Sequence, residues 1–156
     1  MYKRSLVAAD CSRQTLVALR EGALIAQIFG ATAHLLIIDR AAAGWVTADG
    51  LSMVHQPSEG PDLLKLGLER LSRLGVAATG EIRRGDPAQL IATTAARMRA
   101  DLVIIGHRRQ TFLERWWSAS PDSYILDNVQ CSVMVAQETI SDAQFEAHFL
   151  AAPDAK

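Results

Sequence analysis

Short apolar segments alternate with longer segments of helical periodicity along most of the chain. An alternation of this kind predicts a parallel β-sheet with helices on both faces. The segment Leu102–Ile105 contains no polar residue, which is typical of a strand covered on both faces. The five predicted strands are Ser5–Ala9, Ala33–Ile38, Val76–Arg83, Leu102–Ile105 and Cys131–Ala136.

Capping residues mark the ends of the predicted helices. The clearest signal is Asp86-Pro87-Ala88-Gln89, which supplies an N-cap, a first-turn proline and a capping-box partner. Gly30 and Gly75 are suited to ending helices. The predicted helices run from Ser12 to about Gly30, from near Pro61 to Gly75, from Asp86 through Met98, and onward from Ser120.

Five strands with right-handed crossovers make a small doubly wound, Rossmann-like α/β fold. We expect the strand order 3-2-1-4-5, with helices on both faces of the sheet. Ligands of such sheets bind outside the carboxyl ends of the strands, where the strand order reverses. That position lies between the first and fourth strands, so Asp10 and Gly106 are expected to flank a crevice.

The length and composition indicate one soluble domain. The chain has 156 residues, of which 49% are hydrophobic and 21% are charged. We expect a domain over residues 1–137 and a tail over residues 138–156, in which Ile140, Phe145 and Phe149 have helical spacing. The stretch from Arg40 to Gly60 is expected to be irregular, a feature that is often functional in a compact domain.

Charge and cysteine usage exclude several classes of protein. The formal net charge of −1 argues against a nucleic-acid-binding protein. No apolar run has the length of a membrane span or of a secretory signal. Cys11 and Cys131 form no motif, and the four histidines have no metal-ligand spacing. We therefore expect a cytoplasmic protein with no membrane or nucleic-acid partner and no structural metal.

Several segments together resemble the universal stress protein family over nearly the whole chain. They are Leu6–Ser12, His34–Asp39, Gly85–Pro87 and Asp101–Val135. The resemblance implies a stress-linked regulatory or protective protein that acts by binding a ligand or a partner and is not an enzyme.

The segment after the fourth strand bears on nucleotide binding. Nucleotide-binding members of the family carry Gly-x2-Gly-x9-Gly-Ser/Thr there, and the matching positions in this chain are Gly106, Arg109, Ala119 and Ser120. Two glycines are thus replaced, which resembles the branch of the family that lacks ATP binding. Glycine lets a backbone approach a phosphate, whereas a left-handed arginine costs about 1–2 kcal/mol. Pro121 also removes one N–H from the helix start. We expect ATP binding to be weakened or lost, although the Arg109 guanidinium could itself hold a phosphate.

The resemblance also marks Ala9, Asp10 and Ile37 as nucleotide-contacting positions. Asp10 would orient adenosine or a bound Mg²⁺, or it simply ends its strand and caps the next helix. Ile37 would lie beside the adenine, with its side chain in the core. Ser120 is a helix cap that could also contact a phosphate. The implied cofactor is ATP, with Mg²⁺ if it is bound.

Two surfaces are candidates for interactions. Arg83, Arg84 and the segment His107–Arg109 lie near the expected carboxyl edge, where they either attract anions or form a solvated rim. The strand Cys131–Ala136 contains no charge or proline that would discourage pairing at an exposed edge. The resemblance to the family implies dimers that form through the last strand, so we expect an antiparallel homodimer.

Three other functions stay open. The chain could be an ATP- or AMP-binding universal stress protein, or a slow Mg²⁺-dependent nucleotide hydrolase that uses Asp10. No activated nucleophile or general base favours the hydrolase. A protein-interaction module that uses the stretch from Arg40 to Gly60 is the third.

Overall fold

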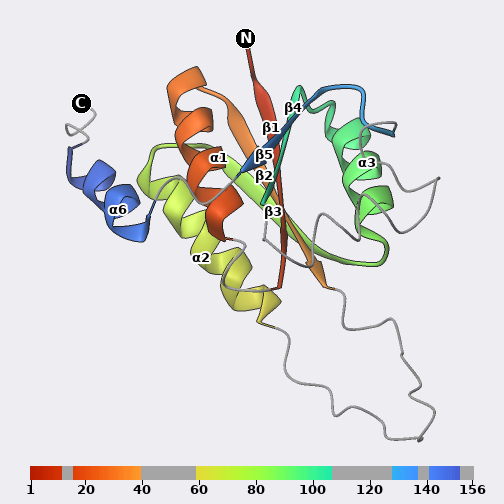
Figure 1. The fold of residues 1–156 in the computed structure, drawn as a ribbon, viewed down its shortest axis with the longest axis horizontal. Coiled ribbons are helices and arrows are strands. Elements are labelled where there is room, and N and C mark those ends of the chain that lie inside the picture. Colours follow the sequence, from red (N-terminus) through yellow and green to blue (C-terminus); the bar gives the residue numbers. More distant parts are fainter. Residues whose placement is uncertain (12–15, 40–58, 107–127, 137–140, 152–156) are drawn as a thin grey trace, which may run out of the picture.

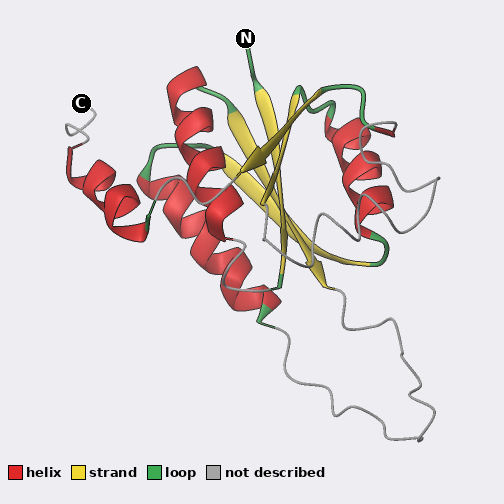
Figure 2. Cartoon of the chain, in the orientation of Figure 1, coloured by secondary structure: helices red, strands yellow, loops and turns green. Residues whose placement is uncertain are grey.

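A computed structural model describes residues 1–11, 16–39, 59–106, 128–136 and 141–151. The described chain forms a single five-stranded sheet with helices on both faces (Figures 1 and 2). The strands are β1 (Arg4–Asp10), β2 (Thr32–Asp39), β3 (Ala78–Arg84), β4 (Leu102–Gly106) and β5 (Ser132–Ala136). The helices are α1 (Leu16–Phe29), α2 (Gly60–Arg73), α3 (Pro87–Met98) and α6 (Asp142–Ala151).

The strand order is β3-β2-β1-β4-β5, and all four neighbouring pairs are parallel. This confirms the predicted doubly wound fold. Since all strands run the same way, their carboxyl ends lie along one edge of the sheet, here called the carboxyl edge. The opposite edge is the amino edge.

The predicted helix signals are present at several ends. The Asp86 carboxylate accepts a hydrogen bond from the Gln89 backbone N–H at 2.9 Å, and Pro87 is the first residue of α3. Gly30 and Gly75 adopt left-handed conformations beyond α1 and α2, with φ of 59° and 70°. Residues 40–58 and the predicted helix start at Ser120 lie outside the described residues.

Each face of the sheet buries its own apolar layer. Val7 and Ala9 of β1 pack on the side of α1 and α2, whereas Leu6 and Ala8 pack on the side of α3. This two-residue alternation follows from the pleat of a strand. All five residues of β4 are buried, as expected for a central strand covered on both faces.

Helix α2 lies close to the sheet because two glycines leave room for it. A Cβ on Gly67 of α2 would collide with Cδ2 of Leu35 in β2, and a Cβ on Gly80 of β3 would lie 2.6 Å from Cδ1 of Leu64 in α2. The same Cβ on Gly80 would lie 2.9 Å from the Leu35 carbonyl oxygen of the neighbouring strand β2. Both glycines therefore allow α2 to pack close to β2 and β3.

The helix α6 joins the core on the side of α1 and α2. Its Phe145 side chain is fully buried there, and the Arg70 guanidinium lies 5.8 Å from the ring centroid. Arg73 of α2 and Glu146 of α6 form an ion pair at 3.6 Å. The tail thus supplies an aromatic side chain that the rest of the core packs around.

We expect Phe145→Ala to lower the free energy of unfolding by about 3–4 kcal/mol, because it leaves a cavity in a closed core. Urea denaturation followed by circular dichroism measures this. The matched control is Glu146→Ala, which removes only an exposed ion pair and should cost less than about 1 kcal/mol. Equal, small effects of the two variants would show that α6 does not contribute to the core.

Candidate functional site

Strand register brings four of the sequence-predicted site residues to the carboxyl edge. Ala9 of β1 is the register partner of Ile37 of β2. On the other side of β1, Ala8 is the partner of Ile105, so Ala9 and Gly106 occupy the next level. Asp10 is the last residue of β1. Ala9, Asp10, Ile37 and Gly106 therefore lie on three adjacent strands, at the position where the strand order reverses.

The side chains at this edge differ in character. Asp10 is half-buried, whereas Ile37 is buried in the core, as the sequence predicts. Beyond Asp10, the Cys11 thiol donates a weak hydrogen bond to the Ile38 carbonyl oxygen at 3.7 Å. This weak contact links the residue that follows β1 to the end of β2.

The remaining predicted site residues lie outside the part of the chain that the structure describes. They are Arg109, Ala119 and Ser120, together with Pro121 beside them. Their roles in phosphate contact stay predictions that rest on the resemblance.

An ion pair between a buried carboxylate and an exposed arginine, at the same edge, was missed by sequence reasoning. Asp39 ends β2 with only 5% of its side chain exposed, and Arg84 ends β3 directly beside it in register. The Arg84 Nη2 and Nε atoms donate to Oδ2 of Asp39 at 3.0 and 3.3 Å. The signal was available, since an acid and a base end two neighbouring parallel strands.

Two of the arginines predicted to attract anions at this edge lie within the described residues, and both face carboxylates. Arg84 binds Asp39, and Arg83 lies 3.8 Å from Glu81. Their positive charge is therefore partly neutralised within the protein. Both side chains remain exposed, so the two pairs reduce the attraction for an anion without removing it.

The described residues of the edge can be tested against a nucleotide with Mg²⁺. Mg²⁺ in nucleotide sites is held by one or two carboxylates together with phosphate oxygens. Asp10 fits this role, whereas Asp39 is held by Arg84. Across the described ranges no three His, Cys, Asp or Glu residues cluster closely enough to hold a metal ion without a ligand. The donors thus suit Mg²⁺ that arrives with phosphates.

The strand order defines a doubly wound α/β protein whose candidate ligand site lies between β1 and β4. The family model described as the universal stress protein family matches residues 1–137. The chain belongs to the universal stress protein family. Within the described residues, none of the helices has the length and apolar character needed to cross a membrane.

Curated relatives agree with this assignment. The universal stress protein A homolog of Haemophilus ducreyi is 28% identical over 140 residues, which cover 86% of this chain and 96% of the relative. Universal stress protein Sll1388 of Synechocystis is 31% identical over 83 residues, so the chain spans about half the length of that relative.

Solved structures share the fold at lower identity. A universal stress protein in complex with cAMP has a TM-score of 0.63 and 17% identity, with 86% of this chain and 96% of that chain covered. A universal stress protein family protein from Arabidopsis thaliana with AMP bound has a TM-score of 0.55 and 18% identity, with coverages of 90% and 97%. At this identity the likeness establishes the fold.

The Asp39–Arg84 pair gives a prediction for stability. We expect Arg84→Ala to lower the free energy of unfolding by about 2 kcal/mol, because it removes two charge-assisted hydrogen bonds from a buried carboxylate. The neighbouring variant Arg83→Ala removes only a long, exposed ion pair and should cost less than about 0.5 kcal/mol. Urea titration of both variants measures the difference. A cost for Arg83→Ala as large as that for Arg84→Ala would contradict a special role for the buried pair.

Proposed function

We propose that this chain is a cytoplasmic, stress-linked regulatory or protective protein that acts by binding a ligand or partner and not by turnover. The ligand that we infer is an adenine nucleotide, bound at the carboxyl edge between β1 and β4. The observation that carries the proposal is the meeting of Ala9, Asp10, Ile37 and Gly106 at one edge of the sheet. Support comes from proteins of similar fold that bind cAMP and AMP at 17% and 18% identity.

We further propose that the nucleotide binds more weakly than in a relative with all three loop glycines. Arg109 and Ala119 occupy two of those glycine positions. A side chain at either position keeps the backbone N–H groups away from a phosphate, which is where glycine loops obtain their affinity. Asp10 and the main chain near Ile37 would hold the nucleoside, so AMP is expected to lose less affinity than ATP.

The absence of turnover is part of the proposal. Hydrolysis of a phosphate ester needs a group that activates water within hydrogen-bond reach. Of the two carboxylates that end β1 and β2 in the described sheet, Asp39 is already engaged through its Oδ2 by the Arg84 guanidinium, so we assign it no role in activating water. Asp10 ends β1 where the strand order reverses, and we assign it a binding role and not a catalytic one.

Calorimetric titration with AMP, cAMP and ATP·Mg²⁺ tests the proposed site. We expect the wild type to bind these nucleotides with dissociation constants above about 100 μM. The double variant Arg109→Gly/Ala119→Gly should bind ATP at least about tenfold more tightly, which is equivalent to about 1.4 kcal/mol. Asp10→Asn should weaken binding of all three nucleotides in both backgrounds. Low-micromolar ATP binding by the wild type, or no gain in the glycine double variant, would contradict weakening by the loop. Steady phosphate release from ATP that is lost in Asp10→Ala would favour a hydrolase.

We also propose that the protein is an antiparallel homodimer through β5. In the described sheet β5 has a neighbour on one side, β4. Ser132 of this strand is exposed, and Val133, Met134 and Val135 are partly buried. These partly exposed apolar residues and a strand edge without charge suit pairing with a second copy.

Sedimentation velocity at micromolar concentration tests the dimer. The wild type should sediment as a dimer, and Ser132→Lys should move the population to monomer, because an edge lysine opposes strand pairing. Ser132→Ala is the control and should remain dimeric. A wild-type monomer would remove the proposal, and so would a Ser132→Lys protein that stays dimeric with an unchanged circular dichroism spectrum.

A further inference from the structure

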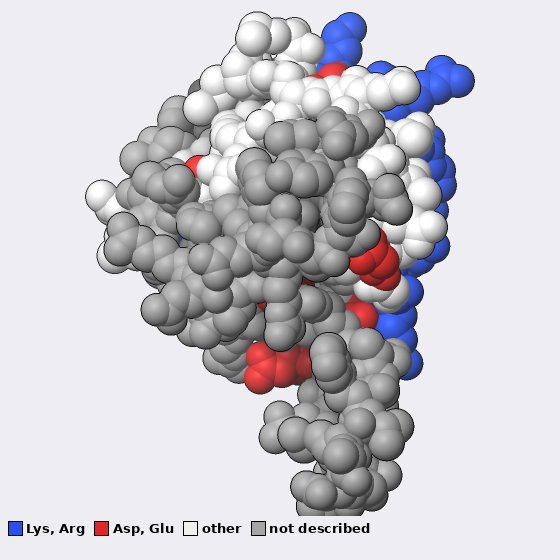
Figure 3. Space-filling view, turned by 45° about the vertical axis from the view of Figure 1, so that its right-hand side comes forward, with Lys and Arg blue, Asp and Glu red and all other residues white. Residues whose placement is uncertain are grey.

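A row of exposed cations runs from the amino edge across the end of α3 and onto β3. We call this row the basic flank. It consists of Lys3, Arg4, Arg83, Arg97 and Arg99. Figure 3 shows Lys and Arg side chains gathered along one side of the molecule. The flank begins on the opposite edge of the sheet from the proposed nucleotide site.

At the amino edge, hydrogen bonds to the backbone position the part of the basic flank formed by Lys3, Arg4 and Arg99. The Asp101 carboxylate accepts hydrogen bonds from the backbone N–H groups of Lys3 and Arg4 at 2.9 and 3.1 Å. The Nε atom of Arg4 donates to the carbonyl oxygen of Arg99 at 2.7 Å, which joins the start of β1 to the end of α3. Asp101 thus engages backbone donors, and the cationic side chains extend into solvent.

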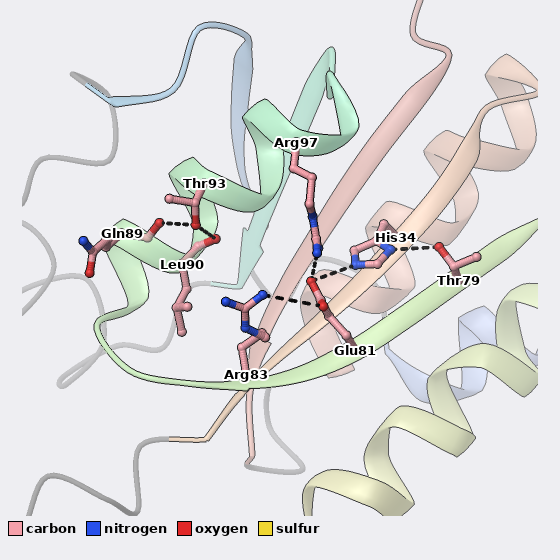
Figure 4. A network of polar contacts seen from close by, with 8 residues as sticks. All are labelled: His34, Thr79, Glu81, Arg83, Gln89, Leu90, Thr93 and Arg97. Atoms are coloured by element: carbon pink, nitrogen blue, oxygen red, sulfur yellow. Dashed lines mark hydrogen bonds and ion pairs between the residues drawn. The ribbon is translucent and has the colours of Figure 1, made fainter.

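Glu81 on β3 contacts the other two arginines of the basic flank, Arg83 and Arg97 (Figure 4). Arg97 reaches from α3 to hydrogen-bond the Glu81 carboxylate, and Arg83 lies 3.8 Å from its other oxygen. His34 bridges the same carboxylate, at 3.5 Å, and the Thr79 hydroxyl, at 2.8 Å. Burial opposes the charge of Glu81, but the hydrogen bond and charge of Arg97, followed by His34, outweigh it and lower its pKa below 4.5. Glu81 therefore stays ionised at neutral pH and orients two guanidinium groups.

The flank keeps an excess of positive charge. Its five cations face two carboxylates, Glu81 and Asp101, in a chain whose formal net charge is −1. Within the described residues, no carboxylate forms an ion pair with the side chains of Lys3 or Arg99. This excess positive charge lies on exposed side chains, where a negatively charged partner can reach it.

An apolar corner adjoins the flank at the amino edge. Tyr2 precedes Lys3, and its ring packs edge-on against Phe29 at 5.3 Å between centroids. Phe29 is 41% exposed and Ile28 is 75% exposed, at the end of α1. Figure 1 shows that the chain start and the ends of α1 and α3 lie at the same end of the molecule. Aromatic and arginine side chains are both enriched at protein interfaces, and here both occur at the amino edge of the molecule.

We propose that the basic flank and the apolar corner form a docking surface for an acidic segment of a partner protein that also carries apolar side chains. Four of the five cations are arginines, whose planar forks match carboxylates in pairs. A nucleic-acid strand fits less well, since Glu81 and Asp101 interrupt the row that a continuous phosphate backbone would follow.

Fluorescence anisotropy of the full chain tests the surface. The probe is a labelled 16-residue peptide of Glu, Asp, Leu and Phe, and its control replaces every acid by Gln or Asn. We expect saturable binding with a dissociation constant in the micromolar range at 50 mM salt, weakened about tenfold or more at 300 mM salt. Lys3→Glu and Arg99→Glu should each weaken binding about fivefold, and Ile28→Gln should weaken it about threefold.

The matched control is Lys65→Glu, an exposed reversal on α2, which should change the affinity by less than about twofold. Circular dichroism confirms that each variant is folded. The proposal is overturned if the acidic peptide does not bind saturably, if the neutral peptide binds equally well, or if Lys65→Glu weakens binding as much as Arg99→Glu. Tighter binding to a 16-nucleotide uridine strand or to phosphatidylserine vesicles than to the peptide would also overturn it.

Discussion

The pairing of β1 with β4 is the constraint on which the candidate site depends. The chain forms β2 and β3 on one side of β1, then crosses over to add β4 and β5 on the other side. Because both strands are parallel to β1, the ends of β1, β2 and β4 meet at one edge, where Ala9 lies between Ile37 and Gly106. The buried apolar faces of β1 and β4 hold this register, since a slip by one residue would turn Val7 and Ile104 away from their shared layer.

The two edges of the sheet carry different chemistry. The carboxyl edge has an acidic residue at the end of β1 and an acid–base pair between β2 and β3 whose carboxylate is buried. The amino edge and the adjoining flank carry arginines that are oriented by Glu81 and by the end of α3. Of the flank residues only Arg83 lies near the carboxyl edge, so a ligand between β1 and β4 and a protein partner at the amino edge would contact largely separate surfaces.

The sequence predicted the features that local patterns encode. Apolar runs located the strands, and Asp86 with Gln89 located the start of α3, because capping depends on residues close in sequence. The pair Asp39–Arg84 could be found by combining the strand ends with the predicted strand order. The pair Glu81–Arg97 could not, because it depends on how α3 packs against β3, which no local pattern contains. The packing of Phe145 was missed for the same reason, since the spacing of the tail indicates a helix but not the surface that it covers. For the candidate site, strand ends located Asp10 and Gly106, whereas the roles of Arg109 and Ala119 rest on resemblance alone.

The most direct test of the nucleotide site is a map of backbone amide shifts in a two-dimensional nitrogen–proton spectrum during titration with AMP. Binding at the carboxyl edge predicts that the largest saturable shifts fall on Ala9, Asp10, Ile38 and Gly106, with little change at Lys3, Phe29 or Arg99. Shifts centred on the amino edge, or no saturable shift at millimolar AMP, would contradict the assignment of the β1–β4 edge as a nucleotide site.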